Sequence, residues 1–430
     1  MKTGIRARCR APLALAALTA ALLGLAACGS NSHATSSAAQ DQTLHPIGSG
    51  LRGPAGLKAT VYATGLPTVA TLAFDSQGRL WAAAAGLSSH RRDGVYLIAS
   101  PGARPLRVIA GLDDPLGLLW QRGTLYVASV GRVDAYSGLR GARFTNHREI
   151  VVGPVAHGEN NDLVPAAGGR LLLGITATCD RCTPKSRYSG SIVSFRTDGR
   201  GLDLYAARIR APFGLTYYPG TADLFVTMNQ PDDLGARTPG DWLAVVRHGE
   251  SWGFPQCYGQ GGSACAGVPK PVAVLDAHAA VGSVVIVATP STREASSAAG
   301  SLTEVATPSR REASGAAGSL TAVATPSRRE ASGAAGSLTA VATPSRREAS
   351  SAAGSLTTVT GGRSIALVSQ WQVAKVQKVV LRRIGSTYRG TVAPFLTGLE
   401  NPLALVLAPD HSLLVGDWGT GRIYRIAAAS

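Results

Sequence analysis

Short strand-like patterns recur along most of the chain and constrain its fold more than any other feature. From Leu57 to the C-terminus, a Gly-Leu or Pro-containing turn precedes a short apolar segment, a Gly-containing turn follows, and further apolar segments complete each unit. The units recur roughly every 40 to 50 residues, a spacing typical of propeller blades. A single unit has too few apolar residues to be stable alone, so the units must pack face to face around an axis.

Six such units can be counted. We therefore predict an all-β, six-bladed β-propeller over residues 56–430. The early segment LKATVYATG is expected to pair with the C-terminal segment GRIYRIA, which would close the ring and remove exposed strand edges. A β-sandwich or a jelly roll is the alternative, but the repeated spacing of turns and strands favours the propeller.

A second, shorter repeat lies within the fifth unit. Four near-identical copies of 18 residues, of the type VATPSRREASGAAGSLTA, span Val287 to Thr358. Each copy offers only Val and Leu as large apolar side chains, although its Thr-Pro could begin a helical turn. We interpret residues 287–358 as a flexible, low-complexity insert produced by tandem duplication. A spacer or an adhesive or phosphorylated arm is the alternative.

The N-terminus has the pattern of an export signal. Basic residues precede the apolar run Ala11–Ala27, and the sequence Leu-Ala-Ala-Cys-Gly that ends at Gly29 resembles a bacterial lipobox. The resemblance implies a lipoprotein signal peptide at 1–27 and a lipidated Cys28, so that the protein would be exported and anchored to the outer face of the cell membrane. An ordinary cleaved signal peptide is the alternative. Residues 28–55 are predicted to form a flexible tether.

The chain is basic, but its basic residues are scattered. The formal charge of +16 falls by four to +12 when the basic residues of the signal are removed. No basic patch interleaved with aromatic residues is visible, and an exported protein rarely meets nucleic acid. The charge is therefore interpreted as a contribution to solubility and to attraction toward anionic envelope surfaces, and no nucleic-acid partner is expected.

Four cysteines remain once Cys9 and Cys28 are assigned to the signal and the anchor. They form two local pairs, Cys179 with Cys182 and Cys257 with Cys265. Outside the cytoplasm two local disulfides are expected. A four-cysteine zinc site is the alternative and would require the two pairs to be adjacent in space.

Several motifs in the propeller region resemble the soluble quinoprotein glucose/sorbosone dehydrogenase family. The carriers of the likeness are His157-Gly158 with Asn160-Asn161, the turn Arg210–Leu215, the loop Asn229–Leu234, the segment Gly249–Pro255 and the pair Asp417-Trp418. That family consists of six-bladed propellers that bind pyrroloquinoline quinone (PQQ) and calcium on the top face. The resemblance implies a dehydrogenase that oxidises a hydroxyl group of an aldose, a sorbosone-like sugar or a polyol.

The resemblance also assigns roles to individual residues. His157 would be the catalytic base that takes the hydroxyl proton, and Arg210 would stabilise negative charge on the quinone. The cofactor-binding residues would be Asn161, Arg210 and Trp371, and the calcium loop would contain Gln230, Pro231 and Asp232.

Some positions depart from the family pattern and leave other interpretations open. Ala211 stands where the family has an asparagine, and Gln230 stands where it has a glycine. His157 could be a polar loop residue, Arg210 could pair with an acid between blades, and Asp232 could be a turn former. The alternative functions are a non-catalytic propeller lipoprotein that binds carbohydrate or an envelope protein, and a lactonase-type metal hydrolase, which would require a central cluster of carboxylate and Asn ligands.

Overall fold

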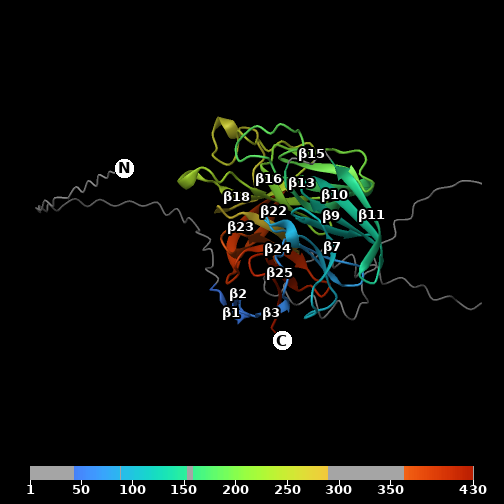
Figure 1. Ribbon diagram of the computed structural model, residues 1–430. Coiled ribbons are helices and arrows are strands. Elements are labelled where there is room, and N and C mark those ends of the chain that lie inside the picture. Colours follow the sequence, from blue (N-terminus) through green and yellow to red (C-terminus); the bar gives the residue numbers. More distant parts are fainter. Residues whose placement is uncertain (1–42, 88, 153–157, 289–362, 430) are drawn as a thin grey trace, which may run out of the picture. The chain divides into compact units, whose positions relative to one another are not determined.

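The computed structural model describes residues 43–87, 89–152, 158–288 and 363–429. In this part of the chain there are six four-stranded antiparallel sheets and one two-stranded sheet, and no α-helix (Figure 1). The six sheets are the blades of a propeller, which confirms the predicted fold and excludes a sandwich or a jelly roll. None of the described helices has the length and hydrophobicity needed to span a membrane.

Each blade is a simple meander whose strands follow one another in sequence. The strands of the first three blades are β4 (Thr71–Phe74), β5 (Leu80–Ala84), β6 (Gly94–Ile98) and β7 (Leu106–Ala110); β8 (Gly117–Gln121), β9 (Thr124–Ser129), β10 (Arg132–Arg140) and β11 (Arg143–Val152); and β12 (Asn160–Ala166), β13 (Arg170–Ile175), β14 (Ser191–Arg196) and β15 (Asp203–Ala207).

The last three blades repeat the pattern, and the sixth takes its outer strand from the N-terminal part. Their strands are β16 (Ala211–Tyr217), β17 (Leu224–Asn229), β18 (Gly240–Val246) and β19 (Ala273–Ala277); β20 (Val281–Val287), β21 (Ile365–Gln370), β22 (Lys375–Ile384) and β23 (Thr387–Leu396); and β24 (Pro402–Leu407), β25 (Leu413–Asp417), β26 (Arg422–Ala428) and β3 (Leu57–Ala63). Short 3-10 helices lie at His90–Arg92, Ala167–Gly169, Gly235–Arg237 and Ser263–Cys265.

The ring closes as the sequence predicts. Strand β3 pairs antiparallel with β26, with Ala63 opposite Ile423 and Leu57 opposite Ala428. The first strands of successive blades, β4, β8, β12, β16, β20 and β24, contact one another in turn, and β24 contacts β4. These six inner strands therefore surround the axis, and β3 completes the sixth blade as its fourth strand and covers the edge of β26.

Glycines allow the inner strands to approach closely. A Cβ atom on Gly214 of β16 would lie 2.7 Å from the carbonyl oxygen of Gly282 in β20, and one on Gly282 would lie 2.7 Å from that of Leu403 in β24. The hydroxyl of Thr227 donates a hydrogen bond of 2.6 Å to the same Gly282 carbonyl oxygen. Neighbouring blades are thus joined near the axis by both backbone contact and polar side chains.

The N-terminal boundary of the folded unit differs from the prediction. Strands β1 (His45–Gly48) and β2 (Leu51–Gly53) form a hairpin, so the predicted tether does not extend to residue 55. Ile47 and Leu51 are buried in the cluster between the fifth and sixth blades, and the backbone of Arg52 exchanges two hydrogen bonds with that of Thr397. The mainly polar composition of this segment predicted that it could not pack on the propeller. Ile47 and Leu51 nevertheless provide that packing.

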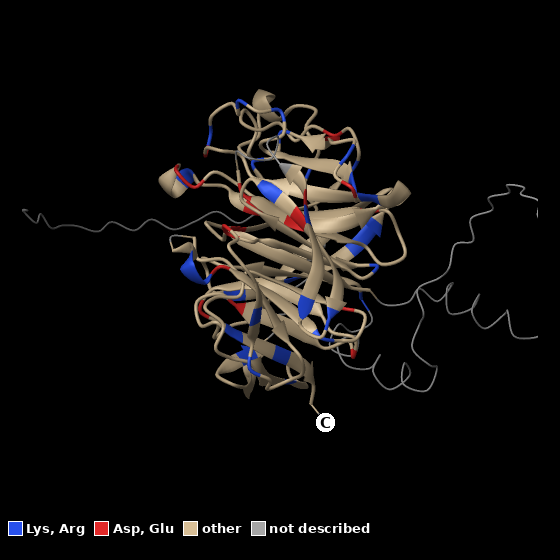
Figure 2. Cartoon of the chain, turned by 45° about the vertical axis from the view of Figure 1, so that its right-hand side comes forward, with Lys and Arg blue, Asp and Glu red and all other residues tan. Residues whose placement is uncertain are grey.

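The predicted insert interrupts the fifth blade at the connection of β20 to β21. Val287 and Ile365, the residues on either side, are paired across the two strands. Residues 289–358 of the repeats, like Cys28 and His157, lie outside the described residues. Figure 2 shows Lys and Arg spread over several strands and loops and interspersed with Asp and Glu.

Candidate functional site

The predicted site residues that the structure describes lie at one end of the propeller, which we call the mouth. It is the end at which the inner strands begin, and it also carries the connections between the second and third strands of each blade. Arg210 directly precedes β16, Asn161 is the second residue of β12, Asp232 follows β17 and Trp371 follows β21. Residues far apart in sequence are thus brought to the same end.

Arg210 is held by an ion pair with a loop of the third blade. Its Nη2 contacts Oδ1 of Asp180, and the two side chains are 16% and 25% exposed. Asp180 Oδ2 also accepts hydrogen bonds from the backbone N–H groups of Asp232, at 3.0 Å, and Asp233, at 3.1 Å. One carboxylate therefore links the arginine to the predicted calcium loop.

A second ion pair docks the same two loops. Arg181 Nε lies 2.6 Å from Oδ1 of Asp233, and its Nη2 donates to Oδ2 at 2.8 Å, so the pairing is bidentate. The hydrogen bond from Arg181 lowers the pKa of Asp233. Because both partners are largely exposed, this pair fixes geometry more than it adds stability.

Asp232 points toward His278, in the connection between the fourth and fifth blades. Its Oδ1 lies 3.6 Å from Nδ1 of His278, a residue with a φ of +54° and a side chain that is 46% exposed. Desolvation raises the pKa of Asp232, and the nearby charge of Arg210 opposes this rise. The ring of His278 is half exposed at the mouth.

Gln230 and Pro231 are buried, and Asp241 holds the backbone of Gln230 in place. The backbone N–H of Gln230 donates to Asp241 Oδ1 at 2.7 Å, and the Gln230 side chain is 4% exposed. Desolvation raises the pKa of Asp241 to about 7. Gln230 turns its amide toward the Met228 carbonyl oxygen, at 3.5 Å, so its side chain does not project into solvent.

Asn161 joins the third blade to the fourth. Its Nδ2 donates to the hydroxyl of Thr176 and to the carbonyl oxygen of Pro212, each at 2.8 Å. Its Oδ1 is buried and finds no partner among the described residues. Only this oxygen is therefore available to a ligand, and the amide nitrogen has a structural role.

Trp371 lies over an apolar floor beneath the mouth. Its ring meets that of Trp418 edge to face, with centroids 5.5 Å apart, and Trp418 Nε1 donates to the Ala85 carbonyl oxygen at 2.8 Å. Both tryptophans pack on a cluster from several blades that contains Ala70, Ala85, Leu116 and Leu403. Trp371 Nε1 is buried and has no hydrogen-bonding partner in the described part of the chain.

Glu159 is a mouth residue to which sequence reasoning gave no role. Its side chain is open to solvent, yet desolvation by the surrounding protein raises its pKa; a hydrogen bond with Thr176 opposes the rise. The charges of Asp114 and Arg210 also act on this carboxyl group. A carboxyl group whose pKa is raised by desolvation is a typical candidate for acid-base chemistry. The signal was present in the HGENN run, where His157 and Asn161 were given roles and Glu159 was not.

Lys375 is the basic residue of the fifth blade that lies at the mouth. It begins β22, opposite Gln370, and its Nζ is 3.0 Å from Oδ2 of Asp276. Arg382 and Arg383 lie near the other end of the same strand. The fold therefore brings Lys375 to the mouth and keeps Arg382 and Arg383 away from it.

The metal site expected at Asp232 is not built from side chains alone. Among the described residues, the group of His, Cys, Asp and Glu close enough to share an ion is His90, Asp93 and Asp113, with His90 Nδ1 2.9 Å and 3.1 Å from the two carboxylates. The hydrogen bond with Asp93 raises the pKa of His90 most. Desolvation opposes this rise, and the nearby negative charges of the acids add to it. Calcium at Asp232 would therefore depend on backbone carbonyl oxygens.

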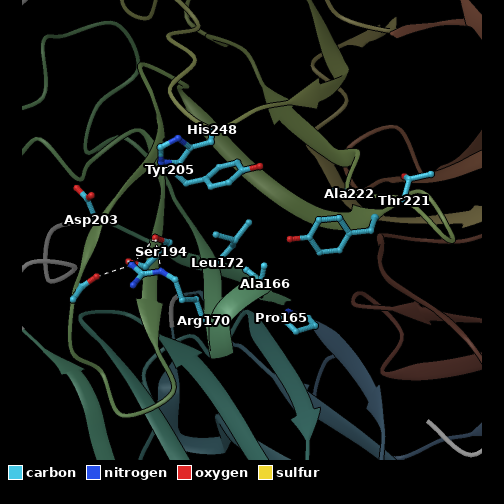
Figure 3. Close-up of a pocket in the computed structure, with 13 residues that line it drawn as sticks. Pro165, Ala166, Arg170, Leu172, Ser194, Asp203, Tyr205, Thr221, Ala222 and His248 are labelled. Carbon is cyan, nitrogen blue, oxygen red and sulfur yellow. Dashed lines mark hydrogen bonds between the residues drawn. The ribbon is translucent and has the colours of Figure 1, made fainter. Parts of the chain in front are cut away.

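A cavity of about 700 Å³ lies at the end of the propeller opposite the mouth. Figure 3 shows the side chains that line it. It is lined by residues from the third and fourth blades, among them Arg170, Tyr205 and Tyr217. Because Tyr217 ends β16 whereas Arg210 precedes it, the cavity is separate from the predicted site.

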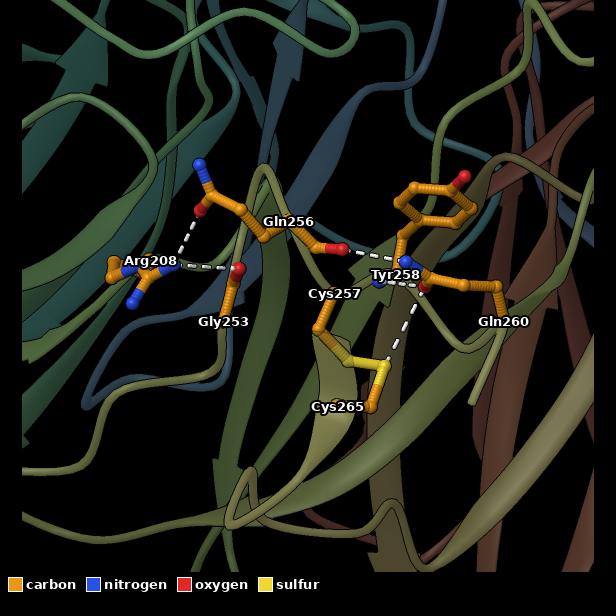
Figure 4. Close-up of a disulfide and its surroundings, with 7 residues drawn as sticks. All are labelled: Arg208, Gly253, Gln256, Cys257, Tyr258, Gln260 and Cys265. Carbon is orange, nitrogen blue, oxygen red and sulfur yellow. Dashed lines mark hydrogen bonds between the residues drawn. A yellow bond between two sulfur atoms is a disulfide. The ribbon is translucent and has the colours of Figure 1, made fainter. Parts of the chain in front are cut away.

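Both predicted disulfides are present, and the four-cysteine zinc site is wrong. The Cα atoms are 5.7 Å apart in Cys179–Cys182 and 5.0 Å apart in Cys257–Cys265. The first closes the loop that carries Asp180. Near the second, Arg208 donates to the carbonyl oxygen of Gly253 at 3.0 Å (Figure 4). It also donates to that of Phe254, at 2.9 Å. The disulfides therefore hold loops in place.

Comparisons with known proteins find relatives only among solved structures. No family model and no curated protein matches the chain. The chain is similar to a putative oxidoreductase (glucose dehydrogenase) from Thermus thermophilus, with 15% identity, a TM-score of 0.56, and coverage of 86% of this chain and 100% of that one.

Two further structures are similarly related. The PQQ-bound form of aldose sugar dehydrogenase from Streptomyces coelicolor has 15% identity and a TM-score of 0.57, covering 88% of this chain and 100% of that one. The soluble aldose sugar dehydrogenase from Escherichia coli, in its apo form, has 14% identity and a TM-score of 0.53, covering 87% and 100%. At such identities the likeness establishes that this chain shares their fold over nearly its whole folded length.

Proposed function

We propose that this protein is a PQQ-dependent dehydrogenase of sugars whose active site is the mouth of the propeller. The observation that carries the proposal is the set of buried polar atoms at the mouth that lack partners among the described residues: Arg210 Nε, Trp371 Nε1, Asn161 Oδ1 and Asn229 Oδ1. A buried, unsatisfied polar group costs about 1–3 kcal/mol, so a polar ligand that pairs with these atoms would be stabilised.

The residues at the mouth fit such a cofactor in their chemistry. PQQ carries carboxylate and carbonyl groups, which accept hydrogen bonds from donors such as Arg210 Nε and Trp371 Nε1. Arg210 would hold it by charge and Trp371 by ring contact and a hydrogen bond. The calcium ion would be held by Asp232 and by the backbone carbonyl oxygens of Gln230 and Pro231. The aldose sugar dehydrogenase from Streptomyces coelicolor, in a PQQ-bound form, supports the proposal.

When bound, the quinone would supply the redox chemistry by accepting the two electrons of the sugar. This chain would supply charge, position and proton transfer. Arg210 would stabilise negative charge that develops beside it, and the apolar floor beneath Trp371 would exclude water from one side of the site.

Proton removal from the sugar hydroxyl is assigned to His157, with Glu159 two residues further on. Glu159 has a carboxyl pKa raised by desolvation, so it is better able to hold a proton near neutral pH than an ordinary glutamate. We infer that Glu159 accepts the proton from His157 or orients the sugar hydroxyl toward it.

The ion pair between Asp180 and Arg210 favours a second candidate function. The charge of Arg210 is already neutralised by Asp180, and Ala211 offers no hydrogen-bonding group beside it. A non-catalytic propeller that binds carbohydrate or an envelope protein would need no free arginine. We further propose, from the sequence alone, that the protein is exported and anchored through a lipid on Cys28.

One experiment separates the two functions. The purified mature protein is given calcium and PQQ, and the absorbance of the bound quinone is measured together with dye reduction by a panel of aldoses and polyols. The dehydrogenase is expected to bind PQQ and to reduce the dye with at least one sugar. Absence of PQQ binding would refute the dehydrogenase. If His157→Ala still binds PQQ but no longer reduces the dye, His157 is supported as the base.

A further inference from the structure

The cavity opposite the mouth has the lining of a binding site. Its residues come from the third and fourth blades and include Arg170, Ser194, Asp203, Tyr205, Tyr217 and His248. A volume of about 700 Å³ is in the range of sites that bind small organic ligands.

Two tyrosines give the cavity an aromatic wall with free hydroxyl groups. Tyr205 and Tyr217 are each partly buried, and in the described part of the chain neither hydroxyl has a hydrogen-bonding partner. Desolvation raises the pKa of Tyr205, and desolvation followed by the proximity of Tyr205 raises that of Tyr217 to about 12. Both phenols therefore stay neutral and can donate as well as accept hydrogen bonds.

Polar groups face these rings across the cavity. Figure 3 shows Arg170 and Ser194 on one side, Tyr205 and His248 on the other, and Leu172 between them. Arg170 is fixed, because it donates to the Ser194 carbonyl oxygen at 3.0 Å and to that of Gly201 at 2.6 Å. The ring of His248 lies edge to face with that of Tyr205, with centroids 5.5 Å apart.

We propose that this cavity is a binding site for a short oligosaccharide. Sugars present apolar C–H faces, which pack on tyrosine rings, and many hydroxyl groups, which need both donors and acceptors. The tyrosine hydroxyls, the Arg170 guanidinium and the exposed Asp203 carboxylate supply both kinds. The opposite charges of Arg170 and Asp203 match a neutral ligand better than an ionic one.

The site is for binding and not for turnover of the same sugar unit. Tyr217 and Arg210 lie at opposite ends of β16, whose seven residues span roughly 20 Å at the usual rise of a strand. A chain bound here would instead keep the protein on a polymer. This inference does not depend on the dehydrogenase, because it concerns a separate cavity.

The test is a calorimetric titration of the full mature chain with maltotriose and with cellotriose, in the absence of PQQ. Saturable binding of at least one trisaccharide is expected. Ala222→Trp, at an exposed lining position, should narrow the cavity and weaken binding more than either tyrosine variant. Tyr205→Phe and Tyr217→Phe keep the packing and should each weaken binding about fivefold, because each removes one hydrogen bond. Tyr258→Phe, outside the cavity, is the matched control and should bind as the unmodified protein does.

Two results would overturn the proposal. One is absence of saturable binding of both trisaccharides by a protein with an unchanged melting temperature. The other is binding that is unchanged in Ala222→Trp and is lost in Arg210→Ala, which would place the sugar at the mouth. Binding that is intact in Arg210→Ala supports the cavity even if no PQQ is bound, so the two proposals fail separately.

Discussion

The ion pair between Arg210 and Asp180 should contribute measurably to stability, unlike a matched pair on the surface. Its side chains are 16% and 25% exposed, whereas those of Arg187 and Asp203, with N and O atoms 3.5 Å apart, are 61% and 68% exposed. A hydrogen bond to a charged group contributes about 1.5–3 kcal/mol when water is largely excluded. An exposed ion pair contributes about 0–1 kcal/mol.

We therefore expect a coupling energy of about 2 kcal/mol between Arg210 and Asp180, and below about 0.5 kcal/mol between Arg187 and Asp203. The assay is a double-mutant cycle for each pair, in which alanine variants are unfolded in urea and followed by tryptophan fluorescence. Asp180→Ala should lower the free energy of unfolding more than Arg210→Ala does, because the Asp180 carboxylate also accepts hydrogen bonds from two backbone N–H groups. Equal couplings in the two cycles would show that Asp180 does not hold the arginine.

Three further predictions concern pH, catalysis and the insert. The pKa of Asp241 is about 7 in the folded protein, whereas its ordinary value is 3.8, so the folded state binds this proton more tightly. The free energy of unfolding should therefore fall by at most about 4 kcal/mol as pH rises from 4 through 7. Urea unfolding across this range should show a flatter slope in Asp241→Asn; an identical slope would contradict the assignment. Glu159→Gln should lower kcat by about a hundredfold without weakening PQQ binding, whereas Glu159→Asp should recover part of it; an unchanged pH profile of kcat would argue against a proton-transfer role. Replacing residues 289–362 by Asn-Gly should leave the melting temperature unchanged, because Val287 and Ile365 already pair, and loss of soluble protein would show that the insert supports the fold.

The sequence by itself determined the architecture of the propeller. The recurring turns and short apolar strands predicted six blades, and the GRIYRIA segment predicted the closure by β3. Both disulfides followed from local spacing. These features depend on short-range patterns, since a strand of alternating or continuous apolar residues and the turn that ends it are specified by neighbours in sequence. The hairpin at His45–Gly53 was missed because only two apolar side chains, Ile47 and Leu51, fasten it.

The tertiary structure alone decided what surrounds each side chain. Asp180 reaches Arg210 from a loop 30 residues earlier, and Asp241 fastens Gln230 from the next strand. Tyr205 and Tyr217, from two neighbouring blades, line one cavity that no sequence motif predicts. The reason is physical: pKa, burial and hydrogen-bond satisfaction depend on atoms contributed by other blades, and the sequence does not say which atoms those are until the ring has closed.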